Sequence, residues 1–231
     1  MLSTYNLNIN SDFQKLISNF KKDWDNPEKK VFYFKSGVKI NNIRDYYYNL
    51  FKNVGNFHKL AEDARINNRE KQKNQEIWME VRFDPTIENA YRHSSNAQPL
   101  HTDGSYNPDY PTATLMCCEN NNAEKGETTF VDAKIIAEIL KNSNLNLYQN
   151  ILDHVLIHER SGDKKESPIL IKAKNGIWNV NWNYYCVSKN INKKEENIKD
   201  NFQKFLLESD QVKKNLIEIK MNKGDALIWK D

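Results

Sequence analysis

Apolar residues recur at helical spacing in several segments of the chain. In residues 11–23, Phe13, Leu16 and Phe20 fall at positions i, i+3 and i+7, which places them on one face of a helix. The same periodicity predicts further helices over residues 41–55, 133–141 and 194–208. Other segments of the chain show the pattern of strands.

Short runs of alternating or continuous apolar residues predict these strands. The alternation is clear in residues 76–84, where Ile77, Met79, Val81 and Phe83 would face the core. Further strands are expected over residues 30–35, around His101, and over 112–118, 128–132, 151–158, 168–172, 177–186, 216–221 and 226–229. Many short strands with a few peripheral helices predict a mainly β fold, a double-sheet jelly roll, in one domain spanning residues 1–231.

Residues 61–75 fit neither pattern. They are dominated by charged and amide side chains, so a solvated helix or a loop is expected there.

Composition and charge narrow the function classes. The 231 residues carry 34 Lys and Arg against 31 Asp and Glu, a net charge of +3, and no dense basic stripe, so we expect no nucleic-acid partner. The three cysteines, Cys117, Cys118 and Cys186, do not suggest a disulfide framework and fit a reducing compartment. Without a signal-peptide pattern or a long apolar run, we expect a cytoplasmic protein with a small-molecule substrate and no membrane partner.

The candidate chemistry centres on His101-Thr102-Asp103. On an extended strand, residues two apart point to the same face, so His101 and Asp103 could supply two adjacent ligands of a 2-His-1-carboxylate iron site. By itself the triplet is a weak motif, and the alternative is a histidine hydrogen-bonded to a nearby aspartate in a loop.

Other segments strengthen the metal hypothesis. The run from Lys125 to Ala133 contains Gly126-Glu127-Thr128, and Gly224-Asp225 leads to Trp229 and Asp231 near the end of the chain. This ordered set resembles the TauD/TfdA family of Fe(II)- and 2-oxoglutarate-dependent oxygenases. Within that family, the run from Cys118 to Leu140 looks most like the branch of γ-butyrobetaine and trimethyllysine hydroxylases.

The resemblance implies a fold, cofactors and site residues. The fold would be a double-stranded β-helix, that is, a jelly roll. His101 and Asp103 would bind Fe(II), and Thr128 would donate a hydrogen bond to a carboxylate oxygen of 2-oxoglutarate. With O2 as the oxidant, the enzyme would hydroxylate a small polar metabolite and convert 2-oxoglutarate to succinate and CO2. A carboxylate at position 103 favours hydroxylation over halogenation, because halogenating relatives carry a small residue there.

Clues to the substrate are few. Residues 178–185 are rich in aromatic residues, which invites comparison with an aromatic cage for a quaternary ammonium group. Ordinary packing of aromatic side chains is the favoured interpretation of this stretch.

The chain departs from the family pattern at its end. In the family a distal histidine and an arginine for 2-oxoglutarate follow the Gly224–Asp231 motif, and the sequence stops at Asp231. We expect the active protein to be longer than this sequence. His101 and Asp103 alone should bind iron weakly, because the facial triad has three protein ligands. Two alternatives remain: a non-catalytic jelly-roll binding protein, or a different metal site that uses His154 or His158.

Overall fold

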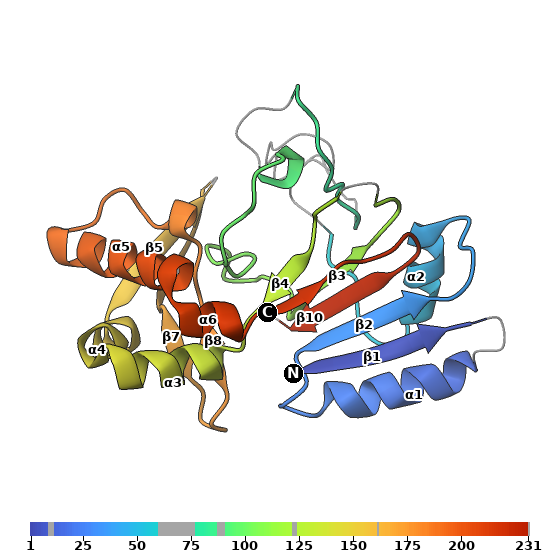
Figure 1. Ribbon diagram of the computed structural model, residues 1–231, viewed down its shortest axis with the longest axis horizontal. Helices are drawn as coiled ribbons and strands as arrows, with labels where there is room; N and C mark the ends of the chain where they lie inside the picture. The colour runs from blue at the N-terminus through green and yellow to red at the C-terminus, as the bar shows by residue number, and fades with distance from the viewer. Residues whose placement is uncertain (9–11, 60–76, 87–90, 122–123, 161, 231) are drawn as a thin grey trace.

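The sheet on the right of Figure 1 joins the two ends of the chain. In this computed structural model, which describes residues 1–8, 12–59, 77–86, 91–121, 124–160 and 162–230, its strand order is β1-β2-β10-β3. The strands are β1 (Leu2–Leu7), β2 (Val31–Ser36), β10 (Ala226–Lys230) and β3 (Ala113–Cys117). β1 runs parallel to β2, and β10 lies antiparallel between β2 and β3.

Strand β2 is apolar on both faces because the sheet is covered on both. Phe32 and Phe34 pack with Phe20 of α1 (Phe13–Trp24) and with Tyr47 of α2 (Ile43–Phe51). On the opposite face Tyr33 joins a second apolar cluster. The helices α1 and α2 therefore form the outer layer of this sheet, as Figure 1 shows.

A second, two-stranded sheet lies over the other face of the four-stranded sheet. It consists of β4 (Thr128–Phe130) and β9 (Ile217–Ile219), paired antiparallel. Ile219 and Phe130 pack in the same cluster as Tyr33, and the ring centroids of Phe130 and Trp229 are 5.5 Å apart. Two sheets thus meet across one apolar layer.

Helices and two hairpins form the remaining part, on the left of Figure 1. Its core surrounds Trp182 and Phe202, which are both almost fully buried. The helices are α3 (Ala133–Ser143), α4 (Leu145–Asp153), α5 (Lys193–Glu208) and α6 (Asp210–Lys214). The hairpins are β5 (Val155–Arg160) with β6 (Asp163–Pro168), and β7 (Leu170–Lys172) with β8 (Trp178–Val180). Two short 3-10 helices are η1 (Tyr91–His93) and η2 (Tyr184–Cys186).

The structure confirms the four predicted helices to within a few residues and corrects several strands. Residues 151–153 belong to α4, so the strand expected from 151 begins only at Val155. Strand β1 was not predicted, because its sequence LSTYNL alternates weakly. The expected helix or loop at residues 61–75 lies outside the described residues.

The expected strand at residues 76–84 is wrong for its described part, 77–84. This segment is extended, but it pairs with a 3-10 turn instead of a strand: the amide of Arg82 donates to Arg92 O, and that of Asp84 to His93 O. The residues expected inside, such as Val81 and Phe83, are exposed, and Trp78 packs against the core instead. On the opposite face Trp78, Glu80 and Asp84 are half-buried, and Arg82 is exposed.

A buried carboxylate holds the turn before β10 against β2. Asp225 is 2% exposed, and it accepts hydrogen bonds from Ser36 N (2.7 Å), Asn222 N (2.8 Å) and the Tyr33 hydroxyl (2.5 Å). Burial first, and then this hydrogen bond, raise the pKa of Tyr33 above its ordinary value. The aspartate of the Gly224-Asp225 motif therefore has a structural role in this chain.

None of the helices in the described part combines the length and apolar character needed to cross a membrane.

We predict that Asp225→Ala lowers the free energy of unfolding by about 3 kcal/mol, because it leaves buried donors without an acceptor. Urea denaturation measures the change. Lys223→Ala, at an exposed position of the same turn, is the control and should leave the midpoint unchanged. Equal midpoints for both variants would contradict this role for Asp225.

Candidate functional site

His101 and Asp103 lie side by side in the folded chain. His101 Nε2 is 3.3 Å from Asp103 Oδ1, and the two side chains are 25% and 34% exposed. Two ligands at right angles on one octahedral ion, each about 2.1 Å from it, lie about 3.0 Å apart. The separation therefore suits two neighbouring ligands of a single metal ion.

The contacts of His101 determine which of its two ring nitrogens carries the proton. His101 Nδ1 lies 2.9 Å from Pro99 O, and a carbonyl oxygen only accepts, so Nδ1 carries the proton. Nε2 then has a lone pair, which faces the carboxylate of Asp103 and the Gln98 amide nitrogen at 3.0 Å. Metal-binding histidines are commonly held in this way, with the second nitrogen donating to a backbone carbonyl.

The pair does not lie on a strand, which corrects the sequence expectation. His101 is in a loop, and residues 103–106 form a turn. Gly104 has φ of +60° there, and a Cβ at this position would overlap the ring of Tyr110. The turn brings the two side chains together, as the alternation of a strand would have done.

Two residues far away in sequence hold this turn. Thr102 N donates to Trp182 O (2.7 Å), and Trp182 N donates to the Thr102 hydroxyl (2.8 Å). The side-chain amide of Asn181 donates to Ser105 O (3.1 Å). Asn181 and Trp182 are not among the predicted site residues, because nothing in the local sequence pattern links them to residues 101–105.

Thr128 is the first residue of β4, in the two-stranded sheet β4–β9. It is opposite Ile219 and shares a face with Phe130, which packs against Trp229 across the apolar layer. Thr128 therefore also points towards that layer. Within the described part of the chain it makes no hydrogen bond to His101 or Asp103, so the structure brings together two of the three predicted site residues.

The alternative metal ligands His154 and His158 lie in different environments. His154 ends α4 and is half-buried, whereas His158 is on β5 and fully buried. Among the described residues, no three His, Cys, Asp or Glu side chains form a group that could hold a metal ion. The structure thus gives no support to a separate metal site built on either histidine.

Aromatic residues in the stretch 178–185 mostly pack in the interior. Trp182 is 1% exposed and contacts Phe202, with ring centroids 4.9 Å apart. Trp178 packs against Tyr148 at 6.5 Å. Ordinary packing explains both tryptophans.

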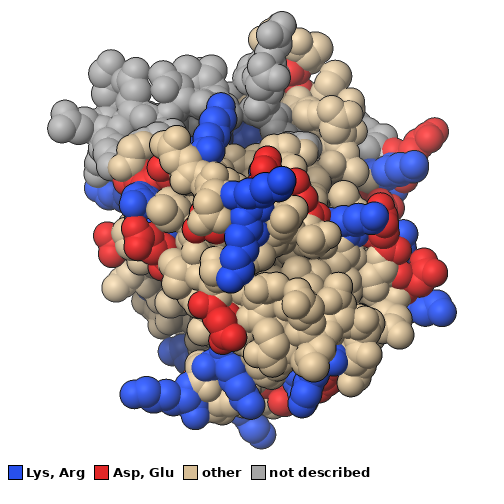
Figure 2. Space-filling model, turned by 90° about the vertical axis from the view of Figure 1, so that its left-hand side faces the viewer, with Lys and Arg blue, Asp and Glu red and all other residues tan. Residues whose placement is uncertain are grey.

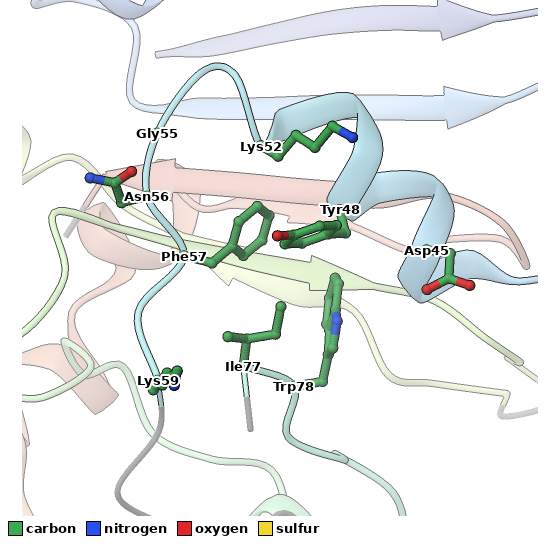
Figure 3. Close-up of a pocket in the computed structure, with 9 residues that line it drawn as sticks. All are labelled: Asp45, Tyr48, Lys52, Gly55, Asn56, Phe57, Lys59, Ile77 and Trp78. Atoms are coloured by element: carbon green, nitrogen blue, oxygen red, sulfur yellow. The ribbon is translucent and has the colours of Figure 1, made fainter. Parts of the chain in front are cut away.

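A pocket of about 650 Å³ lies beside α2. Figure 3 shows the rings of Tyr48, Phe57 and Trp78 grouped on one side of it, with centroid distances of 5.0 Å and 6.2 Å between successive rings. Its lining residues are Asp45, Tyr48, Lys52, Gly55, Asn56, Phe57, Lys59, Ile77 and Trp78. The sequence-predicted site residues are not among them.

On the face in Figure 2, Lys and Arg alternate with Asp and Glu, with uncharged residues between them. This arrangement does not resemble the clustered basic surface that binds a phosphate backbone.

Comparison with known proteins identifies related sequences and folds. Residues 49–230 match the family described as taurine catabolism dioxygenase TauD, TfdA family. No curated protein matches the sequence.

Several solved structures share the fold. A taurine dioxygenase from Burkholderia xenovorans is 11% identical, with a TM-score of 0.61 over 100% of this chain and 77% of that one. An asparagine oxygenase solved with Fe(II), a hydroxyasparagine and succinate is 9% identical, with a TM-score of 0.60 over 94% and 70%. The PvcB protein from Pseudomonas aeruginosa is 12% identical, with a TM-score of 0.57 over 96% and 72%. At these identities the likeness concerns the fold alone.

We predict that stability falls between pH 6.5 and 4 partly because of His158. Burial, and to a lesser degree Lys165, lower its pKa from 6.5 to about 4. The unfolded chain binds this proton first, so the contribution is complete above pH 6.5 and disappears as the pH falls to 4. Its full size is about 3 kcal/mol.

Urea denaturation at several pH values measures this dependence. His158→Phe should flatten the curve between pH 6.5 and 4 relative to the wild type, while His154→Phe should not. Parallel curves for wild type and His158→Phe would show that another group causes the acid sensitivity.

Proposed function

Since this chain belongs to the TauD/TfdA family of dioxygenases, we propose that it is an Fe(II)- and 2-oxoglutarate-dependent oxygenase that hydroxylates a small polar metabolite. One observation carries the proposal: His101 Nε2 and Asp103 Oδ1 lie 3.3 Å apart, with the histidine held in the metal-binding tautomer. The donor set, an imidazole nitrogen and a carboxylate oxygen, suits non-haem iron.

Each site residue has a defined part in this proposal. His101 and Asp103 would hold the metal, and Pro99 O would keep the imidazole oriented towards it. Thr128, pointing to the layer between the sheets, would donate a hydrogen bond to a carboxylate of 2-oxoglutarate. When bound, iron and 2-oxoglutarate supply the oxidising chemistry, with O2 as oxidant and succinate and CO2 as products.

The two facing sheets support a double-stranded β-helix core for this site. Sheet β4–β9 and the four-stranded sheet enclose one apolar layer, as the two halves of a jelly roll do. Thr128 borders that layer, and so does β10, the strand that follows Gly224-Asp225.

The substrate class rests on the sequence resemblance to γ-butyrobetaine and trimethyllysine hydroxylases. The run from Cys118 to Leu140 carries that resemblance; it begins directly after β3 and includes β4 and most of α3. We propose a small polar substrate of this kind and a cytoplasmic location. A carboxylate at position 103 favours hydroxylation over halide transfer.

A non-catalytic binding protein is the rival hypothesis. Its support is that the described residues contain no group of three metal-binding side chains. Since the facial triad has three protein ligands, two should bind Fe(II) weakly, and chelation by 2-oxoglutarate should strengthen the binding.

An anaerobic titration with Fe(II) and 2-oxoglutarate tests the proposal. We predict a weak visible charge-transfer band for the wild type, and its loss in His101→Ala and in Asp103→Ala. His154→Ala, which removes a histidine outside the pair, should keep the band. Absence of the band in the wild type at millimolar Fe(II) and 2-oxoglutarate would favour the non-catalytic rival.

A further inference from the structure

We propose that His158 is a positioning residue for the His101–Asp103 pair. It supports both residues that hold the turn at 101–105, although it lies on another element, β5. The inference rests on the proposed function, because it assigns His158 a part in preparing that site.

The first connection runs through Trp182. Its backbone pairs with Thr102 through hydrogen bonds of 2.7 and 2.8 Å, so its position determines where the residue between the two proposed ligands lies. The Trp182 ring meets the His158 ring edge to face, at 6.1 Å between centroids and 82° between planes. His158 therefore forms part of the support on which Trp182 rests.

The second connection runs through Asn181. Its amide nitrogen lies 3.1 Å from Ser105 O and 3.4 Å from His158 Nδ1. An amide nitrogen only donates, so His158 Nδ1 is the acceptor and its proton is on Nε2. Asn181 thus spans from β5 to the end of the turn, and His158 orients it.

The second ring nitrogen of His158, Nε2, indicates why position 158 is a histidine. Among the described residues, His158 Nε2 and Ser105 Oγ are the buried side-chain atoms without a hydrogen-bond partner. A buried N–H without an acceptor is destabilising, and a phenylalanine would fill the space without that cost. The contact from Nδ1 to Asn181 is what the imidazole provides and an apolar ring cannot.

The charges around His158 keep it in the neutral form that this contact needs. Lys165 lies directly opposite it on β6. On the other side, the residue paired with it is the uncharged Val187. The imidazole is fully buried, so the hydrogen-bond acceptor at Nδ1 is present at neutral pH.

Two substitutions separate hydrogen bonding from packing. His158→Phe keeps a ring of similar size but removes the acceptor, whereas His158→Asn keeps an acceptor near the position of Nδ1 but removes most of the ring. If His158 positions the turn through Asn181, the phenylalanine variant should have a loosened turn with an undiminished unfolding midpoint. The asparagine variant should be less stable overall but keep the turn ordered.

Amide hydrogen exchange at Thr102 reports on the turn without any metal. We expect exchange about tenfold faster in His158→Phe than in the wild type, and little change in His158→Asn under conditions where global unfolding is rare. His154→Phe is the matched control and should exchange as the wild type does. Unchanged exchange in His158→Phe, or faster exchange only in His158→Asn, would overturn the inference.

Titration with Co(II) connects the turn to the site. Substitutions of groups that orient metal ligands commonly reduce affinity 10–100-fold, and we expect a loss of about tenfold in His158→Phe. Equal Co(II) affinities in His158→Phe and wild type would also overturn the inference. If the wild type binds no Co(II) even with 2-oxoglutarate present, the proposed function fails, while the exchange at Thr102 still decides whether His158 holds the turn.

Discussion

The carboxylate of Asp225 is the interaction on which the central sheet depends. Three donors from the β2 strand and from the turn before β10 converge on it, and it is almost completely buried. Nearby, the Tyr47 hydroxyl donates to Gly224 O at 2.6 Å, so α2 is attached to the same turn. Buried polar groups are tolerated only when they are hydrogen-bonded, which makes this turn a fixed point of the fold.

This fixed point positions the two sheets that enclose the apolar layer. Strand β10 lies between β2 and β3, and its face carries Leu227 and Trp229 into the layer covered by β4 and β9. Thr128 points to the same layer. The aspartate of the Gly224-Asp225 motif thus fixes the start of β10 against β2.

The His101–Asp103 turn is attached to the rest of the protein differently. It belongs to a long irregular segment between η1 and β3, so sheet pairing does not hold it. Its order comes from Asn181 and Trp182, whose own positions depend on the core around Phe202 and His158. A metal site needs ligands held within a fraction of an ångström, and for the proposed site the helical half of the molecule would provide that restraint.

The sequence by itself determined the helices with strong periodicity, the apolar strands β2 and β10, and the identity of His101, Asp103 and Thr128 as candidate site residues. The secondary-structure elements and the His101–Asp103 pair follow from local spacing and from motifs, whereas Thr128 follows from the resemblance to the family. Tertiary structure alone decided that residues 77–84 pair with η1 and not with a strand, that a turn and not a strand joins the two proposed ligands, and that Asn181 and Trp182 hold this turn and contact His158. The physical reason is that these features depend on contacts between residues about 20 to 80 positions apart, such as Thr102 with Trp182, which no local pattern encodes.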